Sequence, residues 1–207
     1  MAHATNHSET RQHILRAALK HFADAGYAAT SVQQIVSDAK VSKPALYYYF
    51  RDKAELFKAL VHEAHDEKFR LLCEAAGRGK NIREQLENIF IKLFDYVAKN
   101  RELTRLSFAT NFAAPGEVPE NLGCAGKCER NFEFVHSLIK AAQKNGELNR
   151  NFDSGEMAFG IYGLTNLYLI SHLMERNYRP DLKTSKRIVE LFLTGAAARK
   201  KSRSKKS

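Results

Sequence analysis

Apolar residues recur at helical spacing along almost the whole chain, and this repeat limits the possible folds more than any other feature. Between residues 81 and 99 the apolar positions follow the steps of one helix face: Ile82, Leu86, Ile89, Phe90, Leu93 and Val97. No segment of useful length alternates apolar and polar residues as a half-buried strand does. The pattern therefore predicts an all-α fold of about nine helices.

Glycine and capping residues divide the N-terminal part of this pattern. Gly26 is placed to end the first helix as a C-cap. Ser31 with Gln34, and Asp52 with Glu55, have the spacing of capping boxes at helix starts. Four helices are expected here, over residues 8–25, 31–39, 42–49 and 53–76.

Polar or proline-containing breaks at 77–80, 114–123 and 177–183 divide the rest of the chain. The segments between them keep the helical repeat and predict five further helices, over 81–99, 102–112, 124–144, 154–174 and 184–198. Together the nine expected helices form two regions. The first three are short, and the fourth begins a larger helical region that contains the remaining five.

The charge of the chain is unevenly distributed. Lys and Arg number 33 against 23 Asp and Glu, a net charge of +10. Six of these basic residues lie in a final tail, residues 199–207, that has no acidic residue. Such a tail suits a polyanionic partner such as nucleic acid, but it is equally suited to stay solvated and raise solubility.

The same sequence argues against secretion and membrane insertion. No stretch approaches the ~20 apolar residues of a membrane-spanning helix. The N-terminal residues 1–10 are polar and lack the apolar core of a signal peptide. Three cysteines are an odd number and too few for a disulfide scaffold, which fits a reducing compartment. We therefore expect a cytoplasmic protein that does not enter a membrane.

The first helices carry the most specific motif. A tight turn at Lys40 and Val41 separates the second helix from the third, as in a helix-turn-helix unit. The stretch 26–60 reads GYAATSVQQIVSDAKVSKPALYYYFRDKAELFKAL. In its order of motifs it resembles the tetracycline-repressor (TetR) family of bacterial transcription regulators. The resemblance extends in motif detail over residues 9–60, although Lys40 stands where that family usually has glycine.

A recognition helix presents donors and flat groups to the major groove from its N-terminal end. Lys43 can donate to guanine edges, and Tyr47 follows one turn later on the same face. Leu46 and Phe50 have the spacing of the buried pair of this helix. The resemblance implies base-reading roles for Gln33, Lys43 and Tyr47 and phosphate contacts for Ser31, Tyr48, Tyr49 and Lys53.

The resemblance also implies that the C-terminal helices form a homodimer around a small-molecule pocket. The expected dimer face comprises Gly160, Gly163, Leu164, Leu167, Ile188, Phe192 and Leu193. The expected pocket residues are Phe90, Phe94, Arg105, Phe108, Asn111, Phe112, Cys128, Phe132, His136 and Tyr168. Core packing within one chain is the alternative for each of these residues. This composition favours an apolar or aromatic effector.

We find no motif for catalysis, and expect neither an enzyme nor a cofactor or resident metal. Phosphate-cradling glycine loops, nucleophile elbows and zinc-protease motifs are missing from the sequence. Cys124 and Cys128 lie four residues apart, with His136 nearby, so a redox or metal sensor is one alternative function. His62 and His65 are expected on a solvated helix face.

These observations predict a regulator of three parts. Residues 1–52 are expected to bind DNA, residues 53–198 to bind the effector and to dimerise, and residues 199–207 to form a disordered tail. The expected protein is a repressor that binds a palindromic operator as a homodimer and is released by a small molecule. A DNA-binding structural or division-control protein, with the same head but no ligand, is the other alternative.

Overall fold

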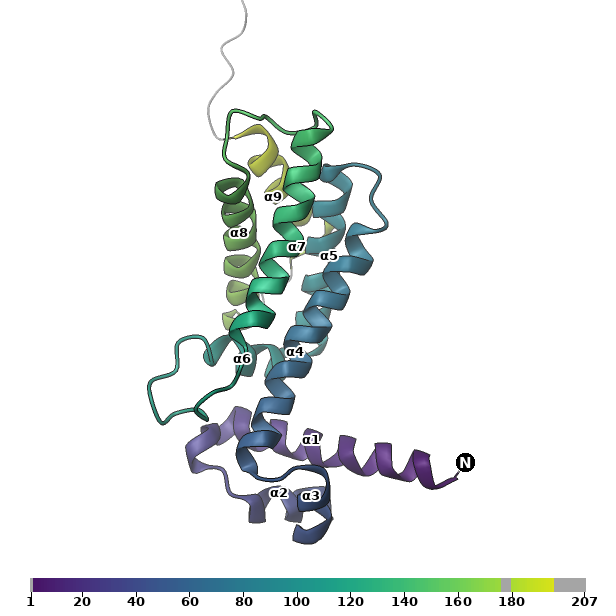
Figure 1. Cartoon of the computed structure of the whole chain (residues 1–207), viewed down its shortest axis with the longest axis vertical. Coiled ribbons are helices and arrows are strands. Elements are labelled where there is room, and N and C mark those ends of the chain that lie inside the picture. The colour runs from purple at the N-terminus through teal and green to yellow at the C-terminus, as the bar shows by residue number, and fades with distance from the viewer. Residues whose placement is uncertain (1, 176–179, 196–207) are drawn as a thin grey trace, which may run out of the picture.

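The computed structural model describes residues 2–175 and 180–195. This part of the chain is all-α, as predicted. Its elements are α1 (Ala2–Ala29), α2 (Val32–Ala39), α3 (Lys43–Tyr49), α4 (Lys53–Ala76), α5 (Ile82–Lys99), α6 (Arg101–Ala109), α7 (Ala125–Lys144), α8 (Ser154–Met174) and α9 (Leu182–Thr194). Helices α1–α3 form a small head below a taller body, and α4 rises from the head into the body (Figure 1).

Capping residues fix most of the helix starts that the sequence predicts. The Ser31 hydroxyl accepts from the Gln34 amide at 3.3 Å, and the Gln34 side chain bonds back to the Ser31 amide at 2.8 Å. Asp52 caps α4 by accepting from the Glu55 amide. However, the Glu55 carboxylate bonds the Arg51 amide rather than that of Asp52, so this second cap is not a reciprocal box.

Several helix ends differ from the prediction, and α6 ends at Ala109 rather than at residue 112. Helix α1 begins at Ala2 rather than at residue 8, and it continues as helix after a break at Gly26. Gly26 has φ 81°, a value that glycine adopts without steric cost, so the predicted break is in the right place. Helix α9 ends at Thr194, before Gly195 with φ 70°, and the rest of its predicted span lies outside the described residues.

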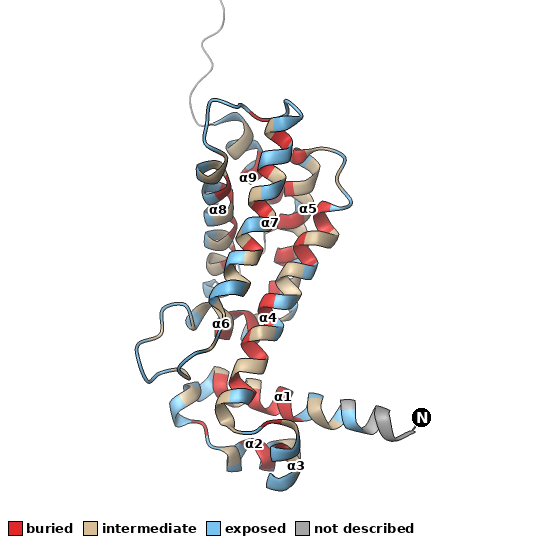
Figure 2. Ribbon diagram, viewed as in Figure 1, coloured by how far each residue is buried: buried red, intermediate tan, exposed pale blue. Residues whose placement is uncertain are grey.

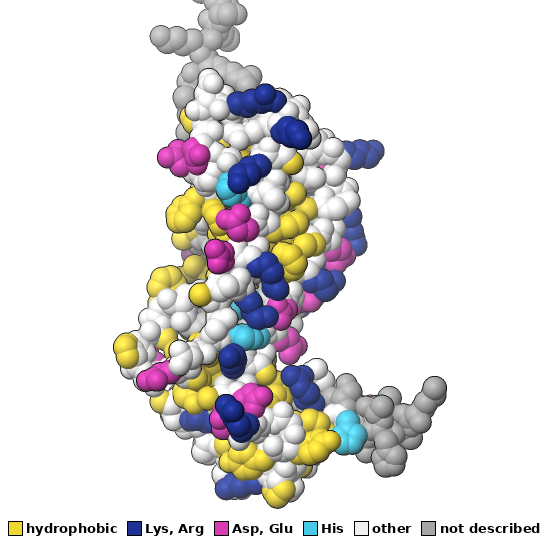
Figure 3. All heavy atoms as spheres, in the orientation of Figure 1, with side chains coloured by type: hydrophobic (Ala, Val, Ile, Leu, Met, Phe, Trp, Pro, Cys, Tyr) yellow, Lys and Arg dark blue, Asp and Glu magenta, His cyan; other side chains and the backbone are white. Residues whose placement is uncertain are grey.

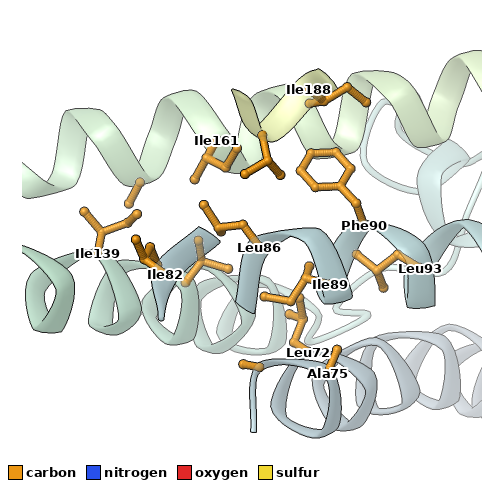
Figure 4. Packing of buried hydrophobic residues seen from close by; sticks show 14 of the residues in the cluster. Leu72, Ala75, Ile82, Leu86, Ile89, Phe90, Leu93, Ile139, Ile161 and Ile188 are labelled. Atoms are coloured by element: carbon orange, nitrogen blue, oxygen red, sulfur yellow. The ribbon is translucent and has the colours of Figure 1, made fainter. Parts of the chain in front are cut away.

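Buried apolar residues form two clusters that share α4. The body cluster comes from the second half of α4 together with α5, α7, α8 and α9. Within it, Leu86 and Phe90 of α5 lie between Ile161 of α8 and Ile188 of α9 (Figure 4). The head cluster comes from α1–α3, the first half of α4, and Leu103 and Leu106 of α6. Buried residues accordingly run along both halves of α4 (Figure 2).

Candidate nucleic-acid interface and ligand pocket

The turn between α2 and α3 has the tight geometry of a helix-turn-helix unit. Lys40 is left-handed, with φ 54° and ψ 41°, and the Val41 amide donates to the Val36 carbonyl at 3.0 Å. A residue with a side chain costs on the order of 1 kcal/mol in this conformation. The turn therefore forms here without the usual glycine, and the exposed side chain of Lys40 extends from the head.

Helix α3 divides its residues between the core and the surface. Leu46 and Phe50 are buried, as predicted, and attach the helix to the head cluster. Lys43, Tyr47 and Tyr48 are exposed, and Tyr48 is 73% exposed. Ala45 donates its amide to the Ser42 hydroxyl, which fixes the first turn. Basic and apolar side chains lie together at the tip of the head over α2 and α3 (Figure 3).

The other proposed DNA-contacting residues occupy different environments. Ser31 and Gln33 are exposed beside α3, with the Ser31 side chain also engaged in its cap. Tyr49 is half-buried, and its hydroxyl lies 2.9 Å from Nδ1 of His7. This contact directs the Tyr49 hydroxyl toward α1. Gln33, Lys43, Tyr47 and Tyr48 are thus exposed, and the Tyr48 ring also contacts the rings of His7 and Tyr49.

Lys53 has partners within the protein that the sequence did not indicate. Its ammonium donates to the carbonyls of Tyr27 and Thr30, both at 2.8 Å, and lies 4.3 Å from the centre of the Tyr27 ring. Burial lowers the pKa of Lys53. The side chain therefore holds the end of α1 against the start of α4, and its role in phosphate binding stays a prediction.

A cavity of about 560 Å³ lies in the body, between α4, α5, α6, α7 and α8. This volume is within the range of small-molecule sites. Five of the predicted pocket residues line it: Phe108, Asn111, Phe112, Cys128 and Phe132. Phe112 and Phe159 are 84% and 74% exposed, so aromatic rings stand where the cavity meets solvent.

The other five predicted pocket residues do not line this cavity. Phe90 and Phe94 belong to the buried core, because their face of α5 turns toward α8 and α9. Tyr168 packs against the same core. His136, in the middle of α7, lies 3.0 Å from the Ser154 hydroxyl at the start of α8. Arg105 donates to the Ala23 carbonyl at 2.7 Å, so it links α6 to α1 instead of entering the pocket.

Several polar groups of the cavity, among them those on α4 and α8, were missed by the sequence prediction. His65 is buried rather than solvated, and Lys68 donates to the Asn166 side chain at 2.8 Å. Both residues fall on the stripe of α4 that contains Val61, Ala64 and Leu72. The sequence could have revealed these two cavity residues, because a histidine and a lysine interrupt an otherwise apolar stripe of α4.

His65 contacts Ser107 and Cys128 without forming a charged group. Its Nε2 is 3.5 Å from the Ser107 hydroxyl, and its two ring nitrogens are 3.8 and 3.9 Å from the Cys128 sulfur. Burial, then Lys68, His62 and Lys127, lower the pKa of His65 to about 4. The imidazole is therefore neutral near pH 7.

The cysteines are free thiols. Burial raises the pKa of both Cys124 and Cys128, so neither is a ready thiolate. Cys124 precedes α7, and its thiol is 3.7 Å from the Leu122 carbonyl, while His62 bonds the same carbonyl at 2.7 Å. Within 2–175 and 180–195, no group of three or more His, Cys, Asp or Glu is arranged to hold a metal.

The predicted dimer face is mostly open to solvent on α8. Gly160, Gly163 and Leu167 are exposed, whereas Leu164, Phe192 and Leu193 are half-buried. A Cβ added at Gly160 or Gly163 would meet no atom within 4 Å, so packing inside the chain does not require glycine there. Ile188 is wrong as an interface residue, because it is 3% exposed and lies in the body core.

No helix in the described part of the chain has the length and apolar character needed to cross a membrane. The basic tail, residues 199–207, lies outside the described residues.

Sequence comparison identifies related regulators. Residues 14–60 match the family described as bacterial regulatory proteins, tetR family. The transcriptional regulator AcuR of Cereibacter sphaeroides is 30% identical over 159 residues, which cover 75% of this chain and 72% of AcuR. The uncharacterized regulator YuxN of Bacillus subtilis is 27% identical over 163 residues, which cover 78% of this chain but only 54% of YuxN.

Solved structures share the complete fold. The regulator FadR from Bacillus subtilis, in complex with stearoyl-CoA, has a TM-score of 0.73 at 20% identity, covering 90% of this chain and 99% of that one. The MbdR regulator from Azoarcus sp. has a TM-score of 0.75 at 21% identity, covering 91% and 100%. At this identity the likeness concerns the fold alone.

Proposed function

The chain belongs to the TetR family and is a transcriptional regulator with a DNA-binding head; from this premise we propose that it represses transcription as a homodimer on a palindromic operator. A small molecule that occupies the body cavity then releases it from DNA. The observation that carries this proposal is the coexistence of an exposed recognition helix and a cavity of about 560 Å³ in one chain.

Reading of bases is the proposed task of Gln33, Lys43 and Tyr47. All three are exposed, and the cap at Ser42 places Lys43 in the first turn of α3, from which recognition helices reach bases. Tyr48 carries a hydroxyl that can donate to a phosphate oxygen. The proposed phosphate contacts of Ser31 and Tyr49 require their hydroxyls to leave Gln34 and His7, their partners in the free protein. The ammonium of Lys53 already donates to two carbonyls. We therefore propose that the phosphate contact at Lys53 is made by backbone amides at the start of α4.

A homodimer follows from the size of the head and the surface of α8. One short helix reads few base pairs, and a two-fold pair of heads reads a palindrome. Leu167 and Met174 lie seven residues apart on α8 and are 61% and 79% exposed. Gly160, exposed on α8, leaves room for a second helix to approach, whereas Gly163 also lines the cavity. We therefore propose that α8 of each protomer, together with α9, forms the interface.

Helix α6 provides the proposed connection between ligand and DNA. Its residues Thr104, Ser107 and Phe108 line the cavity. Its Leu103 and Leu106 belong to the head cluster on the opposite side. An occupant that moves α6 therefore acts directly on the packing of α1. Release requires the occupant to bind the DNA-incompetent arrangement more tightly than the competent one.

The effector is proposed to be largely apolar. The cavity wall includes Phe108, Phe112, Phe132 and Phe159, and FadR of the same fold was solved with stearoyl-CoA. The relatives named above are regulators, and we propose no catalytic activity for this chain.

Selection of bound DNA from a random pool, at physiological salt, tests the proposal. An enriched palindrome is the expected result, and its genomic positions would identify the controlled genes. Salt-sensitive binding with no enriched sequence would contradict the proposal and would favour a DNA-binding structural or division-control protein. The cavity argues against that alternative, because a protein without a ligand has no need of this empty volume.

A redox or metal sensor is less well supported. Both candidate thiols are protonated by virtue of burial, whereas reactive cysteines have lowered pKa values. Replacement of Cys124 and Cys128 by Ser tests this function. If DNA release under oxidant or metal disappears in the double variant, the sensor function is correct and the effector proposal fails.

A further inference from the structure

Lys68 is a basic residue that points into the cavity without an acidic partner. Its ammonium donates to the Asn166 amide oxygen at 2.8 Å, and no carboxylate of the described residues is within ion-pair distance of it. Other basic residues near it are paired: Arg70 bonds Glu67 and Glu74, and Lys92 bonds Glu74. Lys68, unlike these residues, has no ion-pair partner among the described residues.

Lys68 also lies close to two aromatic rings. The ammonium is 4.9 Å from the centre of the Tyr162 ring and 5.8 Å from that of Phe108. Such contacts compensate partly for lost hydration of a cation. A buried charge without a full partner remains costly, so a site of this kind favours an incoming anion.

No other cation contributes to this part of the cavity. His65 is neutral near pH 7, and burial keeps Cys128 a thiol. Glu129 also lines the cavity, but it is exposed and forms no ion pair with Lys68. Burial lowers the pKa of Lys68 to about 8, which leaves the ammonium largely protonated at pH 7. Among the described residues that line the cavity, Lys68 is thus the one positive charge and Glu129, at the exposed side, the one carboxylate.

We propose that the effector is a monocarboxylate with an apolar body, and that Lys68 binds its carboxylate. This inference rests on the proposed effector function and specifies its ligand class. One cation matches one negative charge, whereas a phosphate ester or a coenzyme A ester brings several. Asn166 positions the ammonium of Lys68. The apolar body of the ligand would contact the four phenylalanines that line the cavity, Phe108, Phe112, Phe132 and Phe159.

Lys68 could instead serve only to tie α4 to α8 through Asn166. A Lys68→Gln variant separates these roles, because glutamine can still hydrogen-bond Asn166 but carries no charge. Lys68→Arg restores the charge. Lys92→Gln is the matched control, since Lys92 pairs with Glu74 and does not line the cavity.

Calorimetry on the full-length free protein provides the test. The probes are octanoate, decanoate and phenylbutanoate, each compared with its neutral primary amide, together with octyl phosphate. In the native protein and in Lys92→Gln, we expect each carboxylate to bind roughly 10- to 100-fold more tightly than its amide, as a charge-assisted hydrogen bond provides. In Lys68→Gln the ratio should fall to about one, and Lys68→Arg should recover much of it.

Three results would overturn the inference. One is equal binding of carboxylates and amides, or no binding of carboxylates, in the native protein. Another is a carboxylate preference that persists in Lys68→Gln. The third is tighter binding of octyl phosphate than of any carboxylate.

DNA release, measured separately, distinguishes this inference from the proposed function. Carboxylate binding that depends on Lys68 but leaves DNA binding unchanged would support the site and contradict the release mechanism. Release of DNA by the neutral amides, with no preference for carboxylates, would support the release mechanism and contradict the site.

Discussion

At the scale of single residues, the same residue type has different roles according to what surrounds it. Lys43 is exposed on α3, Lys53 donates to two backbone carbonyls, and Lys68 faces the cavity. The sequence predicts the exposure of Lys43, because its neighbours Leu46 and Phe50 already account for the buried side of α3. The partners of Lys53 and Lys68 lie 23 or more residues away, so local spacing could not reveal them.

Replacing Lys43 by alanine should weaken operator binding by about 1–3 kcal/mol and relax the preference at one base position in each half-site. Binding selections with the variant and with Lys99→Ala would measure this. Lys99 is an exposed body lysine paired with Asp95 and should have no effect. Equal weakening on every DNA sequence would show that Lys43 contacts the backbone instead.

Replacing Lys53 by methionine should destabilise the protein by about 1–3 kcal/mol, since two carbonyls lose a charged donor. Urea unfolding without DNA measures this effect. Arg51→Met is the control, because Arg51 is exposed close to the same helix start. A stability equal to that of the native protein, with weaker binding to all DNA, would assign Lys53 to phosphate contact alone.

His65 should make stability depend on pH. Its folded pKa of about 4 lies below the ordinary value of 6.5, so the unfolded chain binds the proton more readily between these values. Acidification from pH 7 to pH 5 should therefore cost about 2 kcal/mol that a His65→Gln variant does not lose. Urea unfolding at both pH values measures the difference. Exposed His13→Gln should follow the native protein, and an identical pH slope for His65→Gln would contradict the assignment.

At the scale of elements, the helices and their caps were predictable and the cavity was not. Capping is local chemistry, so Ser31, Ser42 and Asp52 identify helix starts in the sequence. Which face of α5 meets a cavity depends on where α6 and α8 lie. Phe90 and Phe94 were therefore assigned to the pocket incorrectly, while Leu93, one residue before Phe94, lines it.

Helix α6 should carry the coupling between effector and DNA. In an Arg105→Ala variant, which loses the bond to the Ala23 carbonyl, DNA binding without effector should change little. The loss of DNA affinity caused by the effector should fall several-fold, within the range of measured coupling changes. DNA titrations with and without effector measure both quantities. Arg83→Ala, at an exposed arginine that pairs with Glu190, is the control; equal coupling in the two variants would exclude this path.

At the scale of the whole molecule, a charge on the exposed stripe of α8 should prevent dimerisation. We expect Leu167→Glu to weaken self-association roughly 30-fold or more, the effect of losing a central interface residue. Sedimentation equilibrium measures this, and operator affinity should fall with it. Phe152→Glu changes an equally exposed residue before α8 and should stay dimeric. A dimeric Leu167→Glu would place the interface elsewhere.

The predicted boundary at residue 52 leaves six of the seven residues proposed to contact DNA on the head side and Lys53 on the other, and it does not separate the cores. Phe22, Ile35 and Leu46 pack in one cluster with Phe57 of α4 and Leu106 of α6. The boundary therefore stays a proposal about function. Binding of DNA and burial of the head core extend over different lengths of the chain.

This shared core restricts how regulators of this architecture can be recombined. In a chimera joined at residue 52, the head of one regulator would pack against α4 and α6 of another. The side-chain volumes in this buried cluster would then no longer match. To keep the head core intact, the junction must lie after the first half of α4. Leu103 and Leu106 of α6 must then come from the same regulator as the head. DNA specificity in this chain thus depends on a core that extends into the body.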